Sequence, residues 1–394
     1  MSTQNNIPTI DALPSEDERA IRESVARIAS KYGPSYYLAK AKEKAAMSEL
    51  IKELADAGFI GINLPEEYGG GGLGMAALSM VIEELGRQGI NLMFLTFSSG
   101  VGAPILKEYG TEQQKAEWLP KLARGEAYFS FGITEPDAGS NTHNIKTTAK
   151  KVGDKFIING QKVWSTGLNR AEKYLVVAKT GTDEKTGRAK ITLLLADNHA
   201  PGLTYHAIPA LTYYPDESFQ VFMDNLEVPE DRVIGEVDKG MQPLFVGLNP
   251  ERICVASICI GLGRYMLDKA VKYANDRSVW GQPIGAHQGL SHPLAEAKIQ
   301  LETAALMVRK AAVLHDHDPA LAGEASNMAK FAAANAAIAC ADIAITIHGG
   351  NAVALEYEIM PYLLQIRLMK NAPVSREMIL NYVSQHVLGL PRSY

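Results

Sequence analysis

The order of hydrophobic patterns along the chain predicts an α+β fold, with a helical part, a β part and a second helical part in succession. Apolar residues recur at helical spacing in the first third, β-rich runs alternate with turn signals in the middle, and long alanine-rich stretches fill the remainder. We therefore expect an N-terminal helical domain at residues 1–127, a middle antiparallel β domain at 128–238 and a C-terminal four-helix bundle at 239–394.

Start and stop signals place the helices of the N-terminal domain. Ser15 followed by Glu18 has the form of a capping box, and apolar residues follow at helical spacing. The glycine run at 69–72 predicts a turn rather than a phosphate site, because it lacks the Lys-Ser/Thr pair of a phosphate-binding loop. Further helices are expected at Met47–Ala57, around Met75–Leu85 and within Glu112–Leu122.

Four runs rich in β-branched and aromatic residues predict strands in the middle domain. The dipeptide Asn159-Gly160 follows the first of these runs and predicts a hairpin turn. The four runs are Lys155–Ile158, Tyr174–Val177, Ile191–Leu195 and Phe219–Phe222.

Alanine-rich stretches predict the helices of the C-terminal bundle. Just upstream of them, Asn249-Pro250-Glu251 has the pattern of a helix N-terminus, with an N-cap, a proline in the first position and an acidic first turn. Inside a longer helix, Pro250 would instead produce a kink or a break near Leu248. The predicted helices are Ile258–Arg277, Ser291–His315, Ala325–Ile347 and Val374–Leu388.

Composition and charge exclude several classes of function. The formal net charge of 39 − 44 = −5 argues against a broad surface for nucleic acid or anionic membranes. The three cysteines have no zinc-type spacing and suggest a reducing compartment. We see no secretory signal and no membrane span, so we expect a cytoplasmic protein. The cluster His315-Asp316-His317 has metal-binding residue types, but we favour a solvated helix end and expect no metal.

Two segments carry residues suited to an aromatic cofactor. In residues 131–140, Thr134 and Ser140 place hydroxyls in a Pro- and Gly-rich turn, where backbone N–H groups can hold a polar ring edge or a phosphate. In residues 159–167, Trp164 offers a flat apolar face, and Thr166 offers a hydroxyl on the same side of a strand. Taken alone, the first segment is better interpreted as a surface turn and the second as a core tryptophan.

Four motifs that occur in order along the chain favour the cofactor interpretation of both segments. They are Ile133–Pro136 with Ala138–Ser140, Asn159–Lys162 with Trp164, Arg277–Gln282 with His287-Gln288, and His348–Asn351. Together they resemble the FAD-dependent acyl-CoA dehydrogenase family over nearly the whole chain. The resemblance implies the acyl-CoA dehydrogenase fold, with FAD bound between the β domain and the C-terminal bundle.

The resemblance implies roles for residues of the β domain. Ile133 and Thr134 would contact the flavin ring, Trp164 would lie against it, and Thr166 would approach its reactive N5 edge. Ser140 is expected at the cofactor as well, and it also matches a residue that holds the CoA part of the substrate.

Further roles are implied for the helical bundle. Arg252 would bind the CoA part of the substrate, with Asn249 as a weaker candidate. A second set matches residues that reach the FAD of a neighbouring subunit or line the same groove, which implies a homo-oligomer, usually a tetramer built as a dimer of dimers. That set is Arg277, Trp280, Gln288, Gly349 and Gly350.

Two positions bear on the catalytic base. Glu251 falls where the isovaleryl-CoA and long-chain dehydrogenases of the family place their carboxylate, and we prefer this role to a surface helix-start role. Pro373 falls where most members carry the base and also give a backbone N–H to the thioester oxygen. Proline has no N–H, so one oxyanion donor is missing unless Val374 donates instead.

The resemblance therefore implies α,β-dehydrogenation of an acyl-CoA to a trans-2-enoyl-CoA, with Glu251 as base, hydride transfer to flavin N5 and an electron-transfer flavoprotein as acceptor. The missing N–H at Pro373 keeps open a second hypothesis, an enoyl-CoA reductase or a dehydrogenase of cyclic or aryl acyl-CoAs. A third hypothesis is a non-catalytic flavoprotein that binds nucleic acid or a protein partner. The −5 charge and the retained Glu251-Arg252 pair argue against this third hypothesis.

Overall fold

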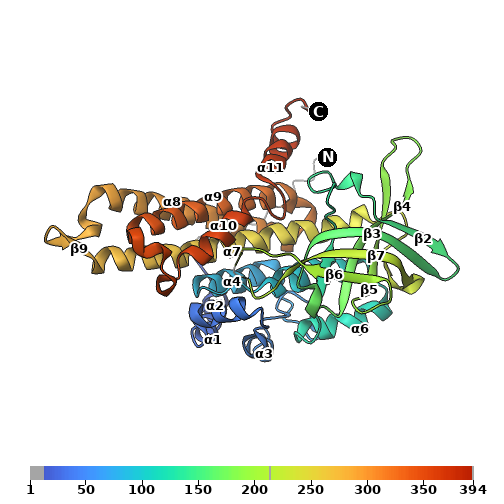
Figure 1. Cartoon of the computed structure of the whole chain (residues 1–394), viewed down its shortest axis with the longest axis horizontal. Helices are drawn as coiled ribbons and strands as arrows, with labels where there is room; N and C mark the ends of the chain where they lie inside the picture. The colour runs from blue at the N-terminus through green and yellow to red at the C-terminus, as the bar shows by residue number, and fades with distance from the viewer. Residues whose placement is uncertain (1–12, 213, 393–394) are drawn as a thin grey trace, which may run out of the picture.

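The computed structural model describes residues 13–212 and 214–392, which form a long helical body with a β sheet at one end (Figure 1). The N-terminal helices, coloured blue, lie along one side of the long C-terminal helices. The sheet, coloured green, lies at the end opposite the hairpin that contains β9. The predicted α+β class with helical, β and helical parts is confirmed, whereas the boundaries that we assigned to the domains stay predictions.

Side-chain caps fix where several N-terminal helices begin. The predicted capping box is confirmed, because the Ser15 hydroxyl accepts from the Glu18 N–H and the Glu18 carboxylate accepts from the Ser15 N–H. The helices are α1 (Glu16–Ala29), α2 (Gly33–Glu43), α3 (Ser48–Asp56), α4 (Gly74–Arg87), α5 (Ala103–Tyr109) and α6 (Glu112–Ala123). Two of these, α2 and α5, and the π-helical segment η2 (Leu95–Gly102) lie outside the predicted elements.

The middle part is an eight-stranded sheet in the order β6-β7-β3-β2-β4-β5-β8, with β1 paired to β4. Most neighbours are antiparallel, as predicted, whereas β1 and β2 each meet β4 in parallel. The strands are β1 (Phe129–Gly132), β2 (Thr148–Val152), β3 (Lys155–Thr166), β4 (Lys173–Thr182), β5 (Ala189–Asp197), β6 (Leu203–Ala207), β7 (Ser218–Pro229) and β8 (Val233–Ile234).

The hairpin turn predicted at Asn159-Gly160 is wrong, because β3 continues through both residues. Gly160 has a φ of +148°, and the pairing of β3 with β7 shifts between Ile158 and Gly160. A Cβ at Gly160 would lie 2.6 Å from the Cα of Thr147. Gly160 therefore allows a β-bulge and a close approach to the backbone of Thr147. Both features favour glycine, as a hairpin turn does.

The C-terminal part contains three long helices and shorter elements after them. The predicted helices correspond to α7, α8, α9 and α11, whereas α10 was not predicted. The elements are α7 (Met241–Asp276), β9 (Ser278–Val279), β10 (Gln282–Pro283), α8 (Gln288–His317), α9 (Ala322–His348), α10 (Met360–Met369), α11 (Arg376–Tyr382) and the π-helical η10 (Val383–Val387).

The helix-start pattern at Asn249 does not mark a helix start, and the break predicted near Leu248 is wrong, because α7 begins at Met241 and runs through Pro250 without interruption. The alternative of a kink near Leu248 stays a prediction. Pro250 is buried in the helix interior. It removes one backbone hydrogen bond. The long apolar face of α7 packs along α4, α8 and α9, and this burial outweighs the local preference of Pro250.

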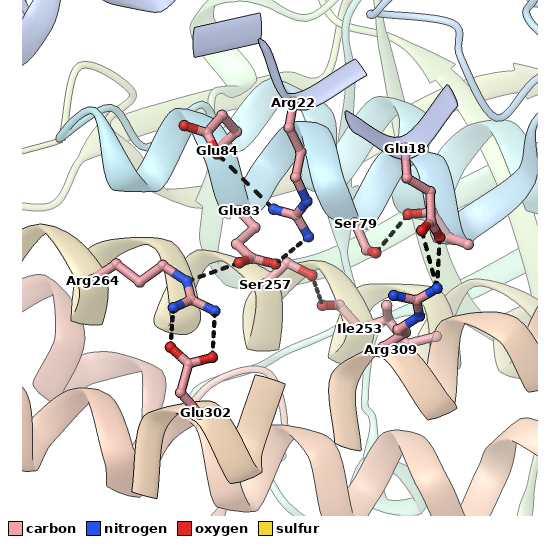
Figure 2. Close-up of polar contacts among 11 residues, drawn as sticks. Glu18, Arg22, Ser79, Glu83, Glu84, Ile253, Ser257, Arg264, Glu302 and Arg309 are labelled. Carbon is pink, nitrogen blue, oxygen red and sulfur yellow. Dashed lines mark hydrogen bonds and ion pairs between the residues drawn. The ribbon is translucent and has the colours of Figure 1, made fainter. Parts of the chain in front are cut away.

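An ion-pair network joins the N-terminal helices to the C-terminal bundle (Figure 2). Arg264 of α7 donates from Nε to Glu83 of α4 at 2.9 Å, and its two terminal nitrogens contact the carboxylate of Glu302 on α8. Arg22 of α1 reaches the other oxygen of Glu83 at 3.0 Å. Because the side chains of Arg264 and Glu83 are only 19% and 12% exposed, solvent screens their pairing less than that of surface pairs.

Candidate active site

Glu251 lies in the interior of α7 and is only 6% exposed. Gly247 and Cys254 share its face of the helix, one turn before and one turn after it. A Cβ at Gly247 would lie 2.7 Å from Ile105 of α5, and one at Gly100 of η2 would lie 2.7 Å from the Cys254 sulfur. The face of α7 that carries Glu251 therefore packs against α5 and η2.

The same segment η2 also contacts the β domain. The Ser98 hydroxyl accepts a hydrogen bond of 3.0 Å from the backbone N–H of Phe129, the first residue of β1. Further along β1, the Ser130 hydroxyl donates to the carbonyl of Thr166 at the end of β3. The π-helical segment thus lies between the Glu251 face of α7 and the strands that carry the predicted flavin residues.

The surroundings of Glu251 favour its protonated form. Burial raises the pKa of its carboxyl from 4.5 to about 7, while the charges of Arg252 and Lys330 act in the opposite direction. A carboxylate with a pKa near neutrality is deprotonated for part of the population and still binds a proton strongly once it receives one. These properties suit a general base.

Arg252 is also buried, at 8% exposure. One terminal nitrogen donates to the Asn249 side-chain oxygen at 2.8 Å and to the Leu248 carbonyl at 3.2 Å. The Ser326 hydroxyl of α9 reaches the same oxygen of Asn249 at 3.3 Å. Among the described residues, Arg252 Nε has no hydrogen-bond partner. An unpaired buried donor costs about 1–3 kcal/mol, so this N–H is suited to an acceptor on a bound ligand.

A buried ion pair organises the turn that contains the predicted flavin contacts Ile133 and Thr134. Lys162 of β3 donates to Glu135 at 2.8 Å and to the Ile133 carbonyl at 3.1 Å, and the Val163 N–H donates to the Thr134 carbonyl. Burial lowers the pKa of Lys162 to about 8. Although burial by itself raises the pKa of Glu135, the charge of Lys162 and hydrogen bonds to the carboxylate leave it lowered.

Trp164 lies on a β-bulge rather than in a regular strand. Its φ is +63°, and the pairing of β3 with β7 shifts between Lys162 and Ser165. The regular alternation of side chains, from which we placed Trp164 and Thr166 on one side, therefore does not apply. Trp164 is 56% exposed, which contradicts the core interpretation. Thr166 is half-buried and pairs with the Ser218 hydroxyl at 2.9 Å, whereas Ser140 is exposed.

The other predicted cofactor residues lie at the far end of the bundle. Arg277 directly follows α7, and Trp280 lies in the β9–β10 hairpin with a φ of +52° and 89% exposure. Gln288, the first residue of α8, is exposed as well. Gly349 and Gly350 directly follow α9, and a Cβ on either residue would meet nothing within 4 Å.

Within one chain, the predicted cofactor residues of the β domain lie far from those at the end of the bundle. The β9 hairpin and the sheet lie at opposite ends of the molecule (Figure 1). Arg277 follows Glu251 by 277 − 251 = 26 positions, which corresponds to about 39 Å along a helix. Contacts between Tyr273 and His348, whose ring centroids are 4.4 Å apart, place the start of the Gly349 segment beside the end of α7.

Pro373 lies in the turn of residues 370–375 between α10 and α11. The turn ends at Ser375, whose hydroxyl caps α11 by accepting from the Met378 N–H. The buried Lys330, which contacts this turn, and the buried pair Lys162 and Glu135 were not predicted as functional residues. A lysine within the alanine-rich stretch of α9 was the one available signal for Lys330.

Two other predictions concern metal and membrane. Within the described residues, no group of three or more His, Cys, Asp or Glu side chains is placed to hold a metal ion. The Asp316 carboxylate instead caps α4, by accepting from the Met75 and Ala76 N–H groups at 2.6 and 2.8 Å. Two described stretches, Met241–Asp276 and Pro319–Val353, are long and apolar enough to cross a membrane, but 78% and 56% of their most apolar windows are buried inside the protein. The cytoplasmic location stays a prediction.

Comparison with known proteins identifies the family. Three family models match in succession: the acyl-CoA dehydrogenase N-terminal domain at residues 15–126, the middle domain at 130–226 and the C-terminal domain at 238–388. The chain is 46% identical to acyl-CoA dehydrogenase FadE12 of Mycobacterium tuberculosis, over 97% of this chain and 98% of that protein. It is 33% identical to a 3-(aryl)acrylate reductase of Clostridium sporogenes, over 82% of this chain and 85% of that protein.

Solved structures agree with the family models. A glutaryl-CoA dehydrogenase of Mycobacterium smegmatis, determined in complex with FADH2, matches with a TM-score of 0.89 and 26% identity over 97% of each chain. The predicted fold, enzyme class and cofactor are thereby confirmed, and the roles of individual site residues stay predictions. With its helical, β and helical parts each matched in order, the chain belongs to the FAD-dependent acyl-CoA dehydrogenase family.

Proposed function

We propose that this enzyme removes a proton and a hydride from the α- and β-carbons of an acyl-CoA thioester, with Glu251 as the base. The observation that supports the proposal most strongly is the burial of Glu251 on the face of α7 that packs against η2, with a pKa raised to about 7. A surface residue in the first turn of a helix would have neither property. The carboxylate therefore lies in the kind of dry, preorganised surroundings in which a general base works.

Different residues of the protein would remove the proton, bind the substrate and exclude water. The Glu251 carboxylate takes the α-proton, so the C–H electron pair is released to form the new α,β double bond as the β-hydrogen leaves with its own electron pair. FAD, when bound, supplies the acceptor for that hydride. The Arg252 N–H without a partner would hold an acceptor group of the substrate, and the apolar residues of η2 would exclude water from the carboxylate.

The residues fit the cofactor in both places where the resemblance puts them. Trp164 and Trp280 expose flat aromatic faces, and large apolar side chains that face solvent are suited to covering by a ligand or a partner. Gly349 and Gly350 border open space, since a Cβ on either residue would meet nothing within 4 Å. The proposed holders are Ile133, Thr134, Ser140, Trp164 and Thr166 of one chain with Arg277, Trp280, Gln288, Gly349 and Gly350 of another, in a homotetramer.

The proposal includes the partners of the reaction. Asn249, Arg252 and Ser140 would hold the CoA part of the substrate. The two electrons taken up by FAD need an acceptor, for which we propose an electron-transfer flavoprotein.

The test is anaerobic mixing of the FAD-loaded enzyme with butyryl-CoA, isovaleryl-CoA, cyclohexanecarboxyl-CoA and 3-phenylpropanoyl-CoA, followed by flavin absorbance. Bleaching by one of these compounds is expected in the wild type, with formation of the matching enoyl-CoA by mass spectrometry. The Glu251→Gln variant should keep FAD and lose bleaching by about 10²–10⁴-fold. Full activity in that variant would exclude Glu251 as the base.

A reductase is the second candidate, and two observations favour it. Pro373 lacks the N–H that would stabilise a thioester oxyanion, and a relative at 33% identity is a 3-(aryl)acrylate reductase. Dithionite-reduced enzyme would then be reoxidised by cinnamoyl-CoA or free cinnamate, while no saturated acyl-CoA would bleach the oxidised flavin. Bleaching without any reoxidation would reject this candidate.

A further inference from the structure

Lys162 of β3 is fully buried, and it contacts the turn after β1 that we propose as one of the cofactor contacts. Its ammonium donates to the Ile133 carbonyl at 3.1 Å and to the Glu135 carboxylate at 2.8 Å. The next residue of β3, Val163, donates its backbone N–H to the Thr134 carbonyl at 2.9 Å. Two consecutive residues of β3 thus hold two consecutive carbonyls of the turn.

The partner of Lys162 is itself held by backbone donors. The Glu135 carboxylate accepts from the Lys146 N–H at 2.6 Å and from the Thr147 N–H at 3.0 Å. The Thr147 hydroxyl donates in turn to the Gln161 carbonyl at 3.2 Å, next to Lys162 on β3. The ammonium of Lys162 therefore has a fixed position, because its carboxylate partner cannot move away without losing both N–H donors.

The contact with the Ile133 carbonyl also determines where the next N–H points. The peptide bond between Ile133 and Thr134 is planar and trans, so the Ile133 carbonyl and the Thr134 N–H point in opposite directions. Among the described residues this N–H has no hydrogen-bond partner, and Thr134 is only half-buried. Because the carbonyl points to the buried Lys162, the turn presents a free donor on the side away from it.

The same lysine directly precedes the bulge that carries Trp164. Lys162 pairs with Val221 of β7, and the register then shifts before Ser165. Trp164 lies within that shift, with a φ of +63°, and is exposed. One buried side chain therefore connects the turn that presents the Thr134 donor to the start of the bulge that presents the aromatic face.

Stability alone gives little reason for an ion pair at this place. The side chains of Lys162 and Glu135 are 0% and 4% exposed. Removing two such charges from water is costly, and replacing a buried ion pair by well-packed apolar residues is often neutral or stabilising. An apolar residue at position 162 could not, however, donate to the Ile133 carbonyl. The feature that requires a lysine is therefore the contact that orients the turn.

We propose that Lys162 is a positioning residue for the cofactor: by holding the Ile133 carbonyl, it directs the Thr134 N–H at the bound flavin. The inference rests on the proposed function, in which this turn contacts FAD. A donor directed at the ring stabilises the electron-rich reduced flavin more than the oxidised flavin. Lys162 should therefore raise the midpoint potential of bound FAD and strengthen FAD binding.

The test uses the FAD-loaded enzyme without substrate. Lys162→Met removes the donor, and the double variant Lys162→Met with Glu135→Gln removes it without leaving a lone buried carboxylate. Glu135→Gln alone breaks the ion pair and keeps the Lys162 donor. Lys155→Met, which breaks an exposed pair with Glu227 at the start of the same strand, is the matched control. The midpoint potential and dissociation constant of FAD are measured, together with hydrogen exchange of the peptide covering residues 131–138.

Both variants without Lys162 should lower the ratio of reduced to oxidised FAD at a given potential about tenfold, which corresponds to about 30 mV for a two-electron couple. Their FAD should bind about tenfold more weakly, and residues 131–138 should exchange faster. Glu135→Gln and the control should not lower the potential. In the wild type, FAD binding should slow the exchange of residues 131–138.

An unchanged potential in the double variant, with FAD bound, overturns the inference. An equal fall in Glu135→Gln also overturns it, because the ion pair rather than the Ile133 contact would then be responsible. If Lys162→Met fails to fold, the double variant decides. Exchange of residues 131–138 that FAD does not slow would reject the turn as a cofactor contact, and the inference with it. If no acyl-CoA bleaches the flavin while these readouts are as expected, the proposed reaction is rejected and the role of Lys162 stands.

Discussion

The clearest consequence of a buried base is that it should make the folded protein less stable at the pH where it works. Glu251→Gln replaces the carboxyl by a neutral group of nearly the same shape. In the folded protein the pKa of Glu251 rises from 4.5 to about 7. At 1.36 kcal/mol for each tenfold change in proton affinity, this rise corresponds to about 3 kcal/mol.

The sign follows from the direction of the shift. Because the folded-state pKa lies above that of the unfolded chain, the folded protein binds this proton more tightly, and stability falls as pH rises from about 4.5 through 7. A glutamine at position 251 does not titrate, so the variant does not lose stability in this way as pH rises. Glu251→Gln should therefore match the wild type near about pH 4 and exceed its unfolding free energy by up to about 3 kcal/mol near about pH 8.

The assay is thermal unfolding of the wild type and the variant at both pH values, at equal protein concentration and FAD content. For a chain of this length the gain at about pH 8 corresponds to about 4 °C in Tm. The difference in Tm between the variant and the wild type at each pH removes the contributions of the other titrating groups, which both proteins share. An equal or lower Tm for the variant at about pH 8 would falsify the buried-charge interpretation of Glu251.

Glu302→Gln supplies a control of opposite sign. Hydrogen bonding to Arg264, and then to Lys298, lowers the pKa of the Glu302 carboxyl to about 2, although burial partly opposes the effect. The ionised Glu302 contributes to the unfolding free energy at pH values above 4.5, the pKa of this carboxyl in the unfolded chain. That contribution is lost as pH falls towards about 2. The control variant should therefore lose stability near about pH 8. The loss should be small, because the Glu302 side chain is 43% exposed and screened.

Three further outcomes are expected. Gly261→Ala should destabilise by about 1–3 kcal/mol in urea unfolding, because its Cβ would lie 2.3 Å from a backbone oxygen of α4, whereas Gly289→Ala, with nothing within 4 Å, should be tolerated. Equal midpoints for the two would contradict the close crossing of α4 and α7. Arg264→Met removes the cation that Glu83 and Glu302 share, which leaves them only Arg22 and Lys298, and should cost about 1–3 kcal/mol in urea unfolding. Trp280→Ala should lower the FAD retained through gel filtration; unchanged FAD content would remove this residue from the cofactor site.

Much of the fold could be predicted from local patterns, since periodicity and caps act within a few residues. The capping box at Ser15 and the long helices of the bundle are examples. The errors arose where one local signal has two uses. Asn159-Gly160 suits a turn and also a bulge, because both need a positive φ, and only the pairing with β7 distinguishes them. Asn249-Pro250-Glu251 suits a helix start, but packing against α4, α8 and α9 extends α7 through it.

The candidate site was harder to predict from the sequence, because it depends more on contacts between residues that are far apart in the chain. The resemblance gave Glu251 and the flavin motifs, but not what surrounds them. The Lys330 contact with Val374 joins residues 374 − 330 = 44 positions apart, and the ion pair of Lys162 with Glu135 joins β3 to the turn that follows β1. No periodicity within one element reports such a pair. A lysine in an apolar stretch shows only that some partner must exist.

The length of α7 gives an independent reason for a site shared between chains. Glu251 and the β domain lie towards one end of the body, while Arg277 and the Gly349 segment lie about 39 Å further along the helices. That separation exceeds the reach of one FAD molecule bound beside Glu251. If both groups bind FAD, the far-end group must therefore serve the cofactor of another chain. An Arg277→Ala chain mixed with a Glu251→Gln chain should then restore some sites that carry both intact halves, and activity in the mixed oligomer but in neither parent would require the shared arrangement.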